Sequence, residues 1–310
     1  MKRIGAVIVG LVFLAAAARA SSPAYGELTD DLLKGIANRT AARATRADSI
    51  PATDPNIGKP IRDVEWVSIP GGKFKLGTPD FDDAKQLPGR IHTIVTFEVS
   101  KTLITVEQYA ECVHTKVPGT RYTWCREPRT EKGCNWAIAG RQLHPINCVS
   151  WDEANAYAWF KGARLLSESE WEYAATSGGK NQKYPWGNAA PTCGDKDGKN
   201  GNVVMHDNGG PGCGSGTTMP VCSKPEGNTE QGLCDMVGNV FHWVQDRYNS
   251  SYARVPTDGS AYEDEGYGRV TRGGAFRSKD ASTLRADDRS YSAPSFQSGV
   301  IGFRLARSSR

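Results

Sequence analysis

The sequence predicts an α+β domain with little regular secondary structure, stapled by disulfide bonds. Its 310 residues include 34 glycines and 17 prolines, a composition that favours turns over long helices and strands. Short helix signals alternate with short strand signals from residue 64 onward. All 8 cysteines lie between Cys112 and Cys234, which predicts covalent cross-links in that stretch.

The first 60 residues differ from the rest. Residues 1–20 match a secretory signal peptide, with Lys2 and Arg3 before an apolar run and Ala18-Arg19-Ala20 as the cleavage site. Residues 21–60 are polar and predict an arm or linker, in which 28–42 can form a short helix. The domain is therefore expected over residues 61–310. No later apolar run approaches the ~20 residues that span a bilayer, so we expect a secreted or periplasmic protein without membrane insertion.

Short strands are expected at several places in the domain. Residues 66–69 predict a strand, Pro70-Gly71-Gly72 a turn, and residues 74–77 the returning strand of a hairpin. Between residues 184 and 233 the chain is rich in glycine and cysteine, which predicts an irregular passage held by disulfides. Further strands are expected around residues 240–243, 269–271 and 303–305.

Three helices are predicted from their first residues. In each, a Ser or Thr is followed three residues later by Glu or Gln, the capping box in which both side chains bond backbone N–H groups. The pairs are Thr105 with Gln108, Ser150 with Glu153, and Ser167 with Glu170. Glycine favours helix ends, so the second helix is expected to stop near Gly162 and the third to reach Gly178-Gly179.

The cysteines predict disulfides rather than a metal site. Zinc is the alternative, but the chain has no C-x-x-C pair. An even number of cysteines in an exported protein favours disulfides. We expect local pairing in two groups of two bridges each, formed by Cys112, Cys125, Cys134 and Cys148 and by Cys193, Cys213, Cys222 and Cys234.

The net charge excludes two classes of partner. The chain has 38 basic and 34 acidic side chains, for a formal charge of +4. This excess is too small to predict binding to nucleic acid or to a membrane surface. We therefore expect neither a nucleic-acid partner nor a membrane partner.

Six motifs occur along the chain in a fixed order. They are Ile69–Phe74, His144–Trp151, Arg164–Ala174, Tyr184–Gly187, Asp235–Val240 and Arg272–Gly274. Together they resemble the signature of the formylglycine-generating enzyme, or sulfatase-modifying factor, superfamily. The resemblance implies a C-type-lectin-like fold of the α+β class with low regular secondary structure. It does not decide function, because one fold hosts several activities.

The C-terminal region lacks the cysteines of the family's oxidases. In the copper-dependent members a cysteine pair follows the Arg-Gly-Gly motif, whereas here Ser278 and Thr283 stand where the thiols would be. Copper(I) is a soft ion that prefers thiolate, so hydroxyls do not replace those ligands. The resemblance therefore implies a member that binds no copper and lacks formylglycine-generating activity.

Structural calcium is a separate expectation from the resemblance. Family members often hold calcium in a D-M-x-G-N-x-x-E segment, which implies ligands here at Asp235, Gly238 and Val240. A second site maps to Asn202 and Val203. His242 stands where the Glu belongs, which weakens the first site because calcium prefers oxygen ligands. The alternative is that these polar side chains bond only the local backbone.

Charged residues gather in the C-terminal third. They are Arg272, Arg277, Arg285, Asp287, Asp288, Arg289 and Arg304. The favoured interpretation is a buried ion network that braces a loop-rich fold. The other is a binding site for an anion or an acidic partner loop, because arginine matches carboxylates at two points. Glu172 with Asp287 or Asp288 would form an acid–base pair if oxidase chemistry were retained.

These observations favour a periplasmic, non-catalytic member of the superfamily that binds an envelope protein and promotes signalling. The chain is similar in kind to the TagR-like accessory proteins of type VI secretion, which implies activation of a transmembrane Ser/Thr kinase through its periplasmic part. The alternative is an exported oxidase of the formylglycine-generating or siderophore-maturation type that acts without the paired copper cysteines. A lectin-like sugar binder is less favoured, because most of the tryptophans lie in core motifs.

Overall fold

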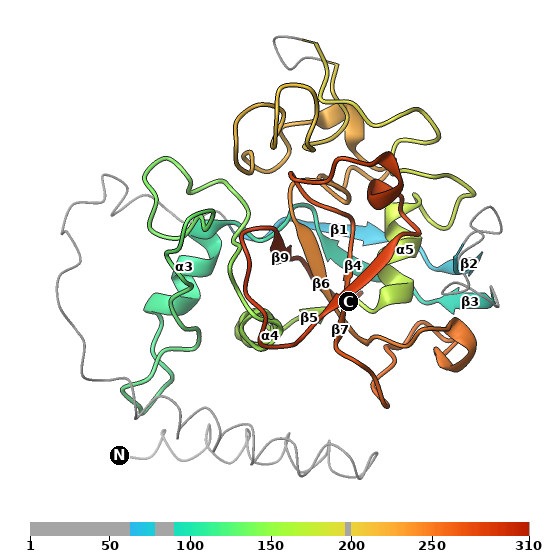
Figure 1. Cartoon of the computed structure of the whole chain (residues 1–310). Helices are drawn as coiled ribbons and strands as arrows, with labels where there is room; N and C mark the ends of the chain where they lie inside the picture. The colour runs from blue at the N-terminus through green and yellow to red at the C-terminus, as the bar shows by residue number, and fades with distance from the viewer. Residues whose placement is uncertain (1–62, 78–89, 196–199, 310) are drawn as a thin grey trace, which may run out of the picture. The chain divides into compact units, whose positions relative to one another are not determined.

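Two four-stranded β-sheets form the centre of the described chain, and a two-stranded ribbon lies to one side of them (Figure 1). The computed structural model describes residues 63–77, 90–195 and 200–309, which belong to the compact unit Gly58–Arg310. The predicted signal peptide, the arm over 21–60 and the helix expected at 28–42 lie outside these residues. No helix among the residues described is long and apolar enough to cross a membrane.

The sheets are built from short strands that are distant in sequence. The first sheet is antiparallel, in the order β1 (Trp66–Ile69), β4 (Phe97–Ser100), β10 (Leu305–Ser308), β5 (Arg164–Leu165). The second is the ribbon of β2 (Gly72–Lys75) and β3 (Ile91–Ile94). The third has the order β8 (Arg289–Ser292), β7 (Arg269–Arg272), β6 (Phe241–Arg247), β9 (Ile301–Phe303), and only its β6–β9 pair is parallel.

The hairpin predicted for residues 66–77 is wrong. β1 pairs with β4 and β2 pairs with β3, so the two consecutive strands belong to different sheets. Pro70 and Gly71 form the connection between them rather than a hairpin turn. Proline has no N–H for a strand ladder. Gly71 lies against the Ile94 carbonyl, where a Cβ would be 2.5 Å from the oxygen, so only glycine fits this crossing.

The three predicted helices are confirmed, together with their capping boxes. They are α3 (Val106–His114), α4 (Trp151–Phe160) and α5 (Glu168–Ala175), and both halves of each box are present. All the residues of α5 are buried, and the helix packs against β3 and β6. Figure 1 shows α3 and α4 on one side of the sheets and the β2–β3 ribbon on the other. Three short 3₁₀ helices complete the helical elements of the described chain, at Pro225–Gly227, Tyr252–Arg254 and Ala281–Leu284.

Arg304 divides the strand expected around residues 303–305 into two. β9 ends at Phe303 and pairs with β6, whereas β10 begins at Leu305 and pairs with β4 and β5. The Arg304 side chain is fully buried and donates to the carbonyl oxygens of Ser100 (3.0 Å) and Cys234 (2.5 Å). It thereby links the first sheet to the segment that leads into β6.

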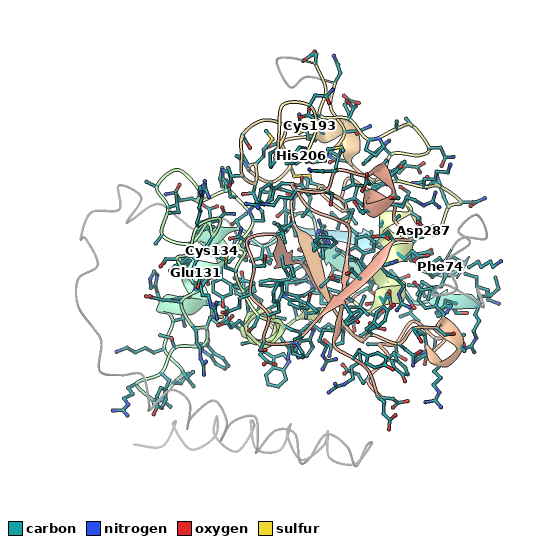
Figure 2. The ribbon with its side chains drawn as sticks, viewed as in Figure 1. Phe74, Glu131, Cys134, Cys193, His206 and Asp287 are labelled. Atoms are coloured by element: carbon teal, nitrogen blue, oxygen red, sulfur yellow. A yellow bond between two sulfur atoms is a disulfide. The ribbon has the colours of Figure 1, made fainter. Side chains whose placement is uncertain are left out.

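Four disulfides hold the irregular parts of the chain, and the predicted grouping is confirmed. The bridges join Cys112 to Cys125 and Cys134 to Cys148, then Cys193 to Cys213 and Cys222 to Cys234. Figure 2 labels Cys134 near α3 and Cys193 in the glycine-rich passage, so the two groups staple different regions. As predicted, the described part of residues 184–233 contains only one 3₁₀ turn and isolated bridges.

Candidate functional site

The candidate site is built on one face of α5. Glu168 and Glu172 are four residues apart, so their carboxylates project from the same side of the helix. Ser167 caps the helix, and its Oγ accepts the Glu170 N–H at 3.1 Å. Because α5 is buried on all sides, both carboxylates require partners inside the protein.

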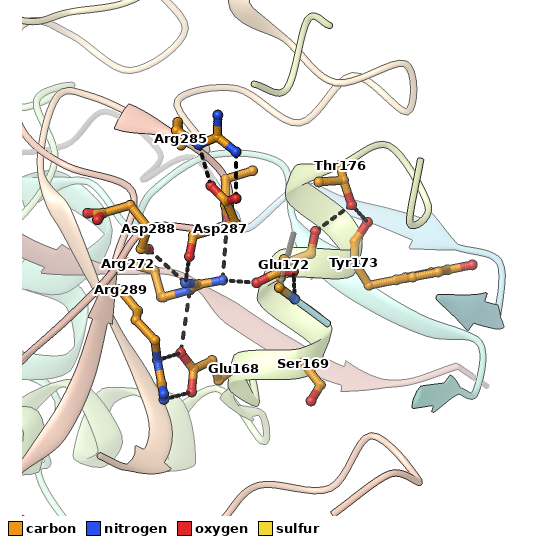
Figure 3. A network of polar contacts seen from close by, with 12 residues as sticks. Glu168, Ser169, Glu172, Tyr173, Thr176, Arg272, Arg285, Asp287, Asp288 and Arg289 are labelled. Atoms are coloured by element: carbon orange, nitrogen blue, oxygen red, sulfur yellow. Dashed lines mark hydrogen bonds and ion pairs between the residues drawn. The ribbon is translucent and has the colours of Figure 1, made fainter. Parts of the chain in front are cut away.

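Glu168 is paired with two arginines. Arg289 contacts it at two points, with Nε to Oε1 at 2.9 Å and Nη2 to Oε2 at 2.5 Å. Arg272 Nε lies 3.7 Å from the same Oε1. Arg289 is also held above the rings of Tyr252 (4.2 Å) and Tyr248 (4.8 Å). Figure 3 shows this two-point pairing beside Arg272.

Arg272 is the centre of the network (Figure 3). Its Nη2 donates to Glu172 Oε2 and to the carbonyl oxygen of Ala286 (3.0 Å). Its Nη1 donates to the carbonyl oxygens of Asp287 (3.0 Å) and Asp288 (2.7 Å). These contacts join α5 to the segment that precedes β8. The Arg272 side chain has no exposed surface.

Two further carboxylates complete the cluster. Asp287 forms a two-point pair with Arg285, at 2.8 and 2.7 Å. Asp246, fully buried in β6, accepts the N–H groups of Glu168 (2.6 Å) and Tyr262 (2.9 Å). The Asp246 carboxyl therefore bonds the first turn of α5, where an acceptor is favoured by the helix dipole.

Burial perturbs the acids of the network. It raises the pKa of Glu172 to about 7, although the Arg272 charge acts in the opposite direction. Burial and then the neighbouring Glu168 charge raise the pKa of Asp246. These carboxyls are near their protonation boundary at neutral pH, which is a property of both catalytic acids and buried ion networks.

Most of the predicted charged residues lie in a buried network, in line with the favoured interpretation, whereas the buried Arg304 bonds other carbonyls, those of Ser100 and Cys234. Arg285, Asp287 and Arg289 join Arg272 in the buried network, and Asp288 contributes its carbonyl. Arg277 is exposed and lies over the Phe276 ring at 5.3 Å. The network also contains Glu168 and Asp246, which sequence reasoning did not place there. The spacing of Glu168 and Glu172 was the available signal, since four residues is one helical turn.

Comparison with known proteins identifies the family. The model of the sulfatase-modifying factor enzyme 1-like domain matches residues 56–309. The chain belongs to this family. It is 35% identical over 187 residues to a formylglycine-generating enzyme of Streptomyces coelicolor, covering 57% of each chain. The solved structure of PvdO from Pseudomonas aeruginosa is 29% identical with a TM-score of 0.56, covering 78% of this chain and 94% of PvdO.

Other relatives of the sulfatase-modifying factor domain carry different names. A protein named Inactive C-alpha-formylglycine-generating enzyme 2, from Bos taurus, is 28% identical and covers 78% of this chain and 88% of its own. The serine/threonine-protein kinase Pkn1 of Chlamydia trachomatis is 31% identical over 78% of this chain. This chain spans 38% of the kinase and a little over half of the S. coelicolor relative, so whole-protein activities do not transfer with the match.

Ser278 and Thr283, which the resemblance led us to expect at the positions of the family's cysteine pair, bond the local backbone. Ser278 Oγ accepts the Ala275 N–H at 3.1 Å, and Thr283 Oγ1 donates to the Asp280 carbonyl oxygen at 2.8 Å. Every cysteine of the chain is in a disulfide, so no free thiol is present. The four bridges are typical of a protein that folds in an oxidising, extracytoplasmic compartment.

The two segments predicted to bind calcium lie next to each other. The Asn239 N–H donates to the Val204 carbonyl oxygen at 2.9 Å, which joins residues 235–240 to residues 202–203. Among the predicted ligands, Asp235 accepts the Cys222 N–H (2.7 Å), Asn202 accepts the Thr192 N–H (2.8 Å), and the Gly238 N–H bonds the Gly273 carbonyl oxygen. Val203 and Val240 have hydrocarbon side chains, so only their backbone carbonyl oxygens could bind an ion.

His242 changes the first of these sites. Its Nδ1 accepts the Trp171 indole N–H at 2.7 Å. Burial and then the Arg304 charge hold the pKa of His242 well below its usual range, so the imidazole is neutral. Asp235 is then the one carboxylate among the predicted ligands, and it already accepts a backbone hydrogen bond. Calcium binding therefore depends on backbone carbonyls, and it stays a prediction.

Proposed function

We propose that this protein is a non-catalytic, periplasmic sulfatase-modifying factor domain that binds an envelope protein and promotes signalling. The observation that carries the proposal is the state of its cysteines. All 8 form disulfides, and the resemblance implies that Ser278 and Thr283 stand where the family's oxidases carry their thiol pair. Hydroxyls are hard ligands and do not replace the thiolates that hold the soft copper(I) ion.

The relatives support a binding role. A family member named as inactive covers most of this chain, so the domain is found in proteins without the oxidase activity. The match to Pkn1 places the same kind of domain within a protein named as a serine/threonine kinase. In its specific form, our proposal is that the chain activates a transmembrane Ser/Thr kinase through the periplasmic part of that kinase. That the kinase controls type VI secretion rests on the resemblance to TagR-like proteins alone.

The buried network supports the same conclusion. Arg272, Arg285 and Arg289 are satisfied by internal carboxylates and carbonyls. These arginines therefore connect α5 to the C-terminal segment through internal contacts. A partner would be recognised by other residues, which are exposed.

A capture experiment tests the proposal. Residues 21–310 are immobilised, incubated with an envelope extract, and the retained proteins are identified by mass spectrometry. The same chain, reduced and unfolded, is the control. We expect a kinase periplasmic domain or another envelope protein on the folded bait only. An empty folded bait contradicts the binding role, and kinase-dependent secretion that survives deletion of the gene contradicts the kinase form.

The second candidate is an exported oxidase that acts without the paired cysteines. Glu172 favours it, because a carboxyl with a pKa of about 7 beside Arg272 is suited to proton transfer near neutral pH. Elemental analysis of the same bait discriminates the two. Stoichiometric copper or iron supports the oxidase, whereas calcium alone supports the proposed structural calcium of a binding domain.

A further inference from the structure

One short segment of the chain has an unusual charge. The 15 residues from Cys112 to Arg126 contain no aspartate or glutamate, whereas basic and acidic side chains are nearly balanced over the whole protein, at 38 and 34. We call residues 114–126 the basic finger. Its cationic and aromatic side chains are His114, Lys116, Arg121, Tyr122, Trp124 and Arg126.

The basic finger is a hairpin fixed at its base. Lys116 and Thr123 form an antiparallel bridge, and the Val117 N–H donates to the Tyr122 carbonyl oxygen at 2.8 Å. The disulfide between Cys112 and Cys125 closes the base and ties it to the last turn of α3. The hairpin is therefore ordered before any partner arrives, which reduces the entropy lost on binding.

The positive charges of the basic finger are available to a partner. Lys116, Arg121 and Arg126 are exposed, and none of the ion pairs in the described chain involves them. Neighbouring cations differ in this respect. Lys161, at the end of α4, pairs with Glu111 at 2.8 Å, and Arg129 pairs with Glu131 at 3.2 Å.

Aromatic rings lie at the base of the basic finger. Trp124 is 39% exposed, and its ring centroid is 6.3 Å from that of Phe160 in α4. The preceding residue of the helix, Trp159, is 51% exposed. Arg121 lies 5.5 Å from the ring centroid of Tyr122. Half-exposed tryptophan and tyrosine beside arginine are the residues that dominate protein interfaces.

We propose that the basic finger is the docking site for an acidic polypeptide segment of the envelope partner, a step that rests on the proposed binding function. Exposed lysine and arginine, with no internal acid to neutralise them, complement carboxylates, and arginine can hold a carboxylate at two points. The half-exposed rings offer apolar surface for a neighbouring side chain of the same segment.

The geometry favours a polypeptide over a lipid surface. A hairpin that enters a membrane carries its large apolar side chains at the tip. Here the tip is Pro118-Gly119-Thr120, and the Trp124 ring lies at the opposite end, against Phe160 of α4, with Tyr122 between them along the chain. A partner that follows the length of the basic finger can reach both the charges and the rings.

Site-directed photo-crosslinking tests the proposal in the intact protein. Tyr122→p-benzoylphenylalanine reports on the basic finger, and Tyr267→p-benzoylphenylalanine is the matched control, because Tyr267 is 80% exposed in a different part of the chain. After irradiation of the cell envelope, mass spectrometry identifies the crosslinked peptides. We expect the probe at position 122, and not the one at 267, to join a segment rich in aspartate and glutamate.

The outcomes separate this inference from the proposed function. The docking site is overturned if protein crosslinks form from position 267 alone. It is also overturned if position 122 crosslinks to lipid, or to a segment without an excess of acidic residues. In each of these cases the proposed binding role is not contradicted. If neither position gives a protein crosslink, the result contradicts both the docking site and the proposed binding role.

A charge-reversal titration then measures the contribution of the cations. The acidic segment found by crosslinking is synthesised and titrated against the wild type and against Lys116→Glu/Arg121→Glu. The control is Lys73→Glu/Lys75→Glu, two exposed lysines of β2. We expect at least ten-fold weaker binding in the finger variant, an unchanged Kd in the control, and equal melting temperatures for both. Equal Kd values for the two variants would overturn the proposal.

Discussion

Arg272 connects more of the buried polar groups than any other residue described in the network. It pairs with Glu172, approaches Glu168, and donates to three consecutive carbonyls. Its guanidinium also lies 5.0 Å from the ring centroid of Trp171. A buried charge of this kind stabilises the fold only while its partners remain in place.

Truncation of Arg272 is therefore expected to be severe. Arg272→Ala leaves the buried Glu172 without its arginine and removes a donor from three carbonyls, whereas Glu168 keeps Arg289 and Glu172 keeps the Gly77 N–H. We expect the change to lower the free energy of unfolding by about 3–5 kcal/mol. Chemical denaturation measures this change. Arg277→Ala, at an exposed arginine of the same segment, is the control and is expected to change it by less than about 0.5 kcal/mol. Equal changes in the free energy of unfolding for the two variants would show that the buried network does not stabilise the fold.

Glu172 predicts a pH dependence of stability. Its pKa is raised from 4.5 to about 7 in the folded protein. The protonated folded state is favoured, so this contribution to stability is complete below about pH 4.5 and is lost as the pH rises through 7. The difference corresponds to roughly 3 kcal/mol. The raised pKa of Asp246 acts in the same direction.

The measurement is the free energy of unfolding at several pH values between 6.5 and 8, above the range in which the lowered pKa values of His92, His144 and His242 make stability rise with pH. We expect it to fall over this range in the wild type and to fall less in Glu172→Gln, whose side chain does not ionise. The slope, rather than the absolute stability, is the informative quantity, because the amide also weakens the pair with Arg272. A wild type whose stability rises towards pH 8 would contradict the raised pKa.

At the level of elements, local signals were sufficient for helices but not for strand pairing. The capping boxes at Thr105, Ser150 and Ser167 identified all three α-helices of the described chain, because a cap is a contact within four residues. The partners of β1 and β2 are set by contacts with β4 and β3, more than fifteen residues away. No local pattern distinguishes a hairpin turn from the crossing at Pro70-Gly71.

The disulfide that closes the basic finger is expected to stabilise the domain. In Cys112→Ser/Cys125→Ser the cross-link over a sequence separation of 13 is lost, and we expect the free energy of unfolding to drop by about 3 kcal/mol. Lys116→Ala, an exposed substitution in the same hairpin, is expected to change it by less than about 0.5 kcal/mol. If denaturation gives the same free energy of unfolding for the double variant and the wild type, the hairpin is not coupled to the domain.

At the level of the whole molecule, the family and the fold class could be predicted from ordered motifs, whereas the site could be predicted only in part. Arg272, Arg285, Asp287 and Arg289 were recognised as a group because they are close in sequence. Glu168 and Asp246 are far from them in the chain, and their role emerges only when α5 and β6 pack beside β7. The basic finger, by contrast, is visible as a run without acids, but only the structure shows that Lys116, Arg121 and Arg126 form no ion pair with the described residues.

The central claim is that this sulfatase-modifying factor domain has lost the family's thiol chemistry and binds another protein. The most direct measurement incubates the disulfide-bonded protein with copper(I), air and a cysteine-containing peptide of the sulfatase type, and follows conversion of the thiol to an aldehyde by mass spectrometry. An active formylglycine-generating enzyme is the positive control. We expect no aldehyde above the protein-free reaction and no stoichiometric copper on the protein. Catalytic turnover of the peptide would contradict the account.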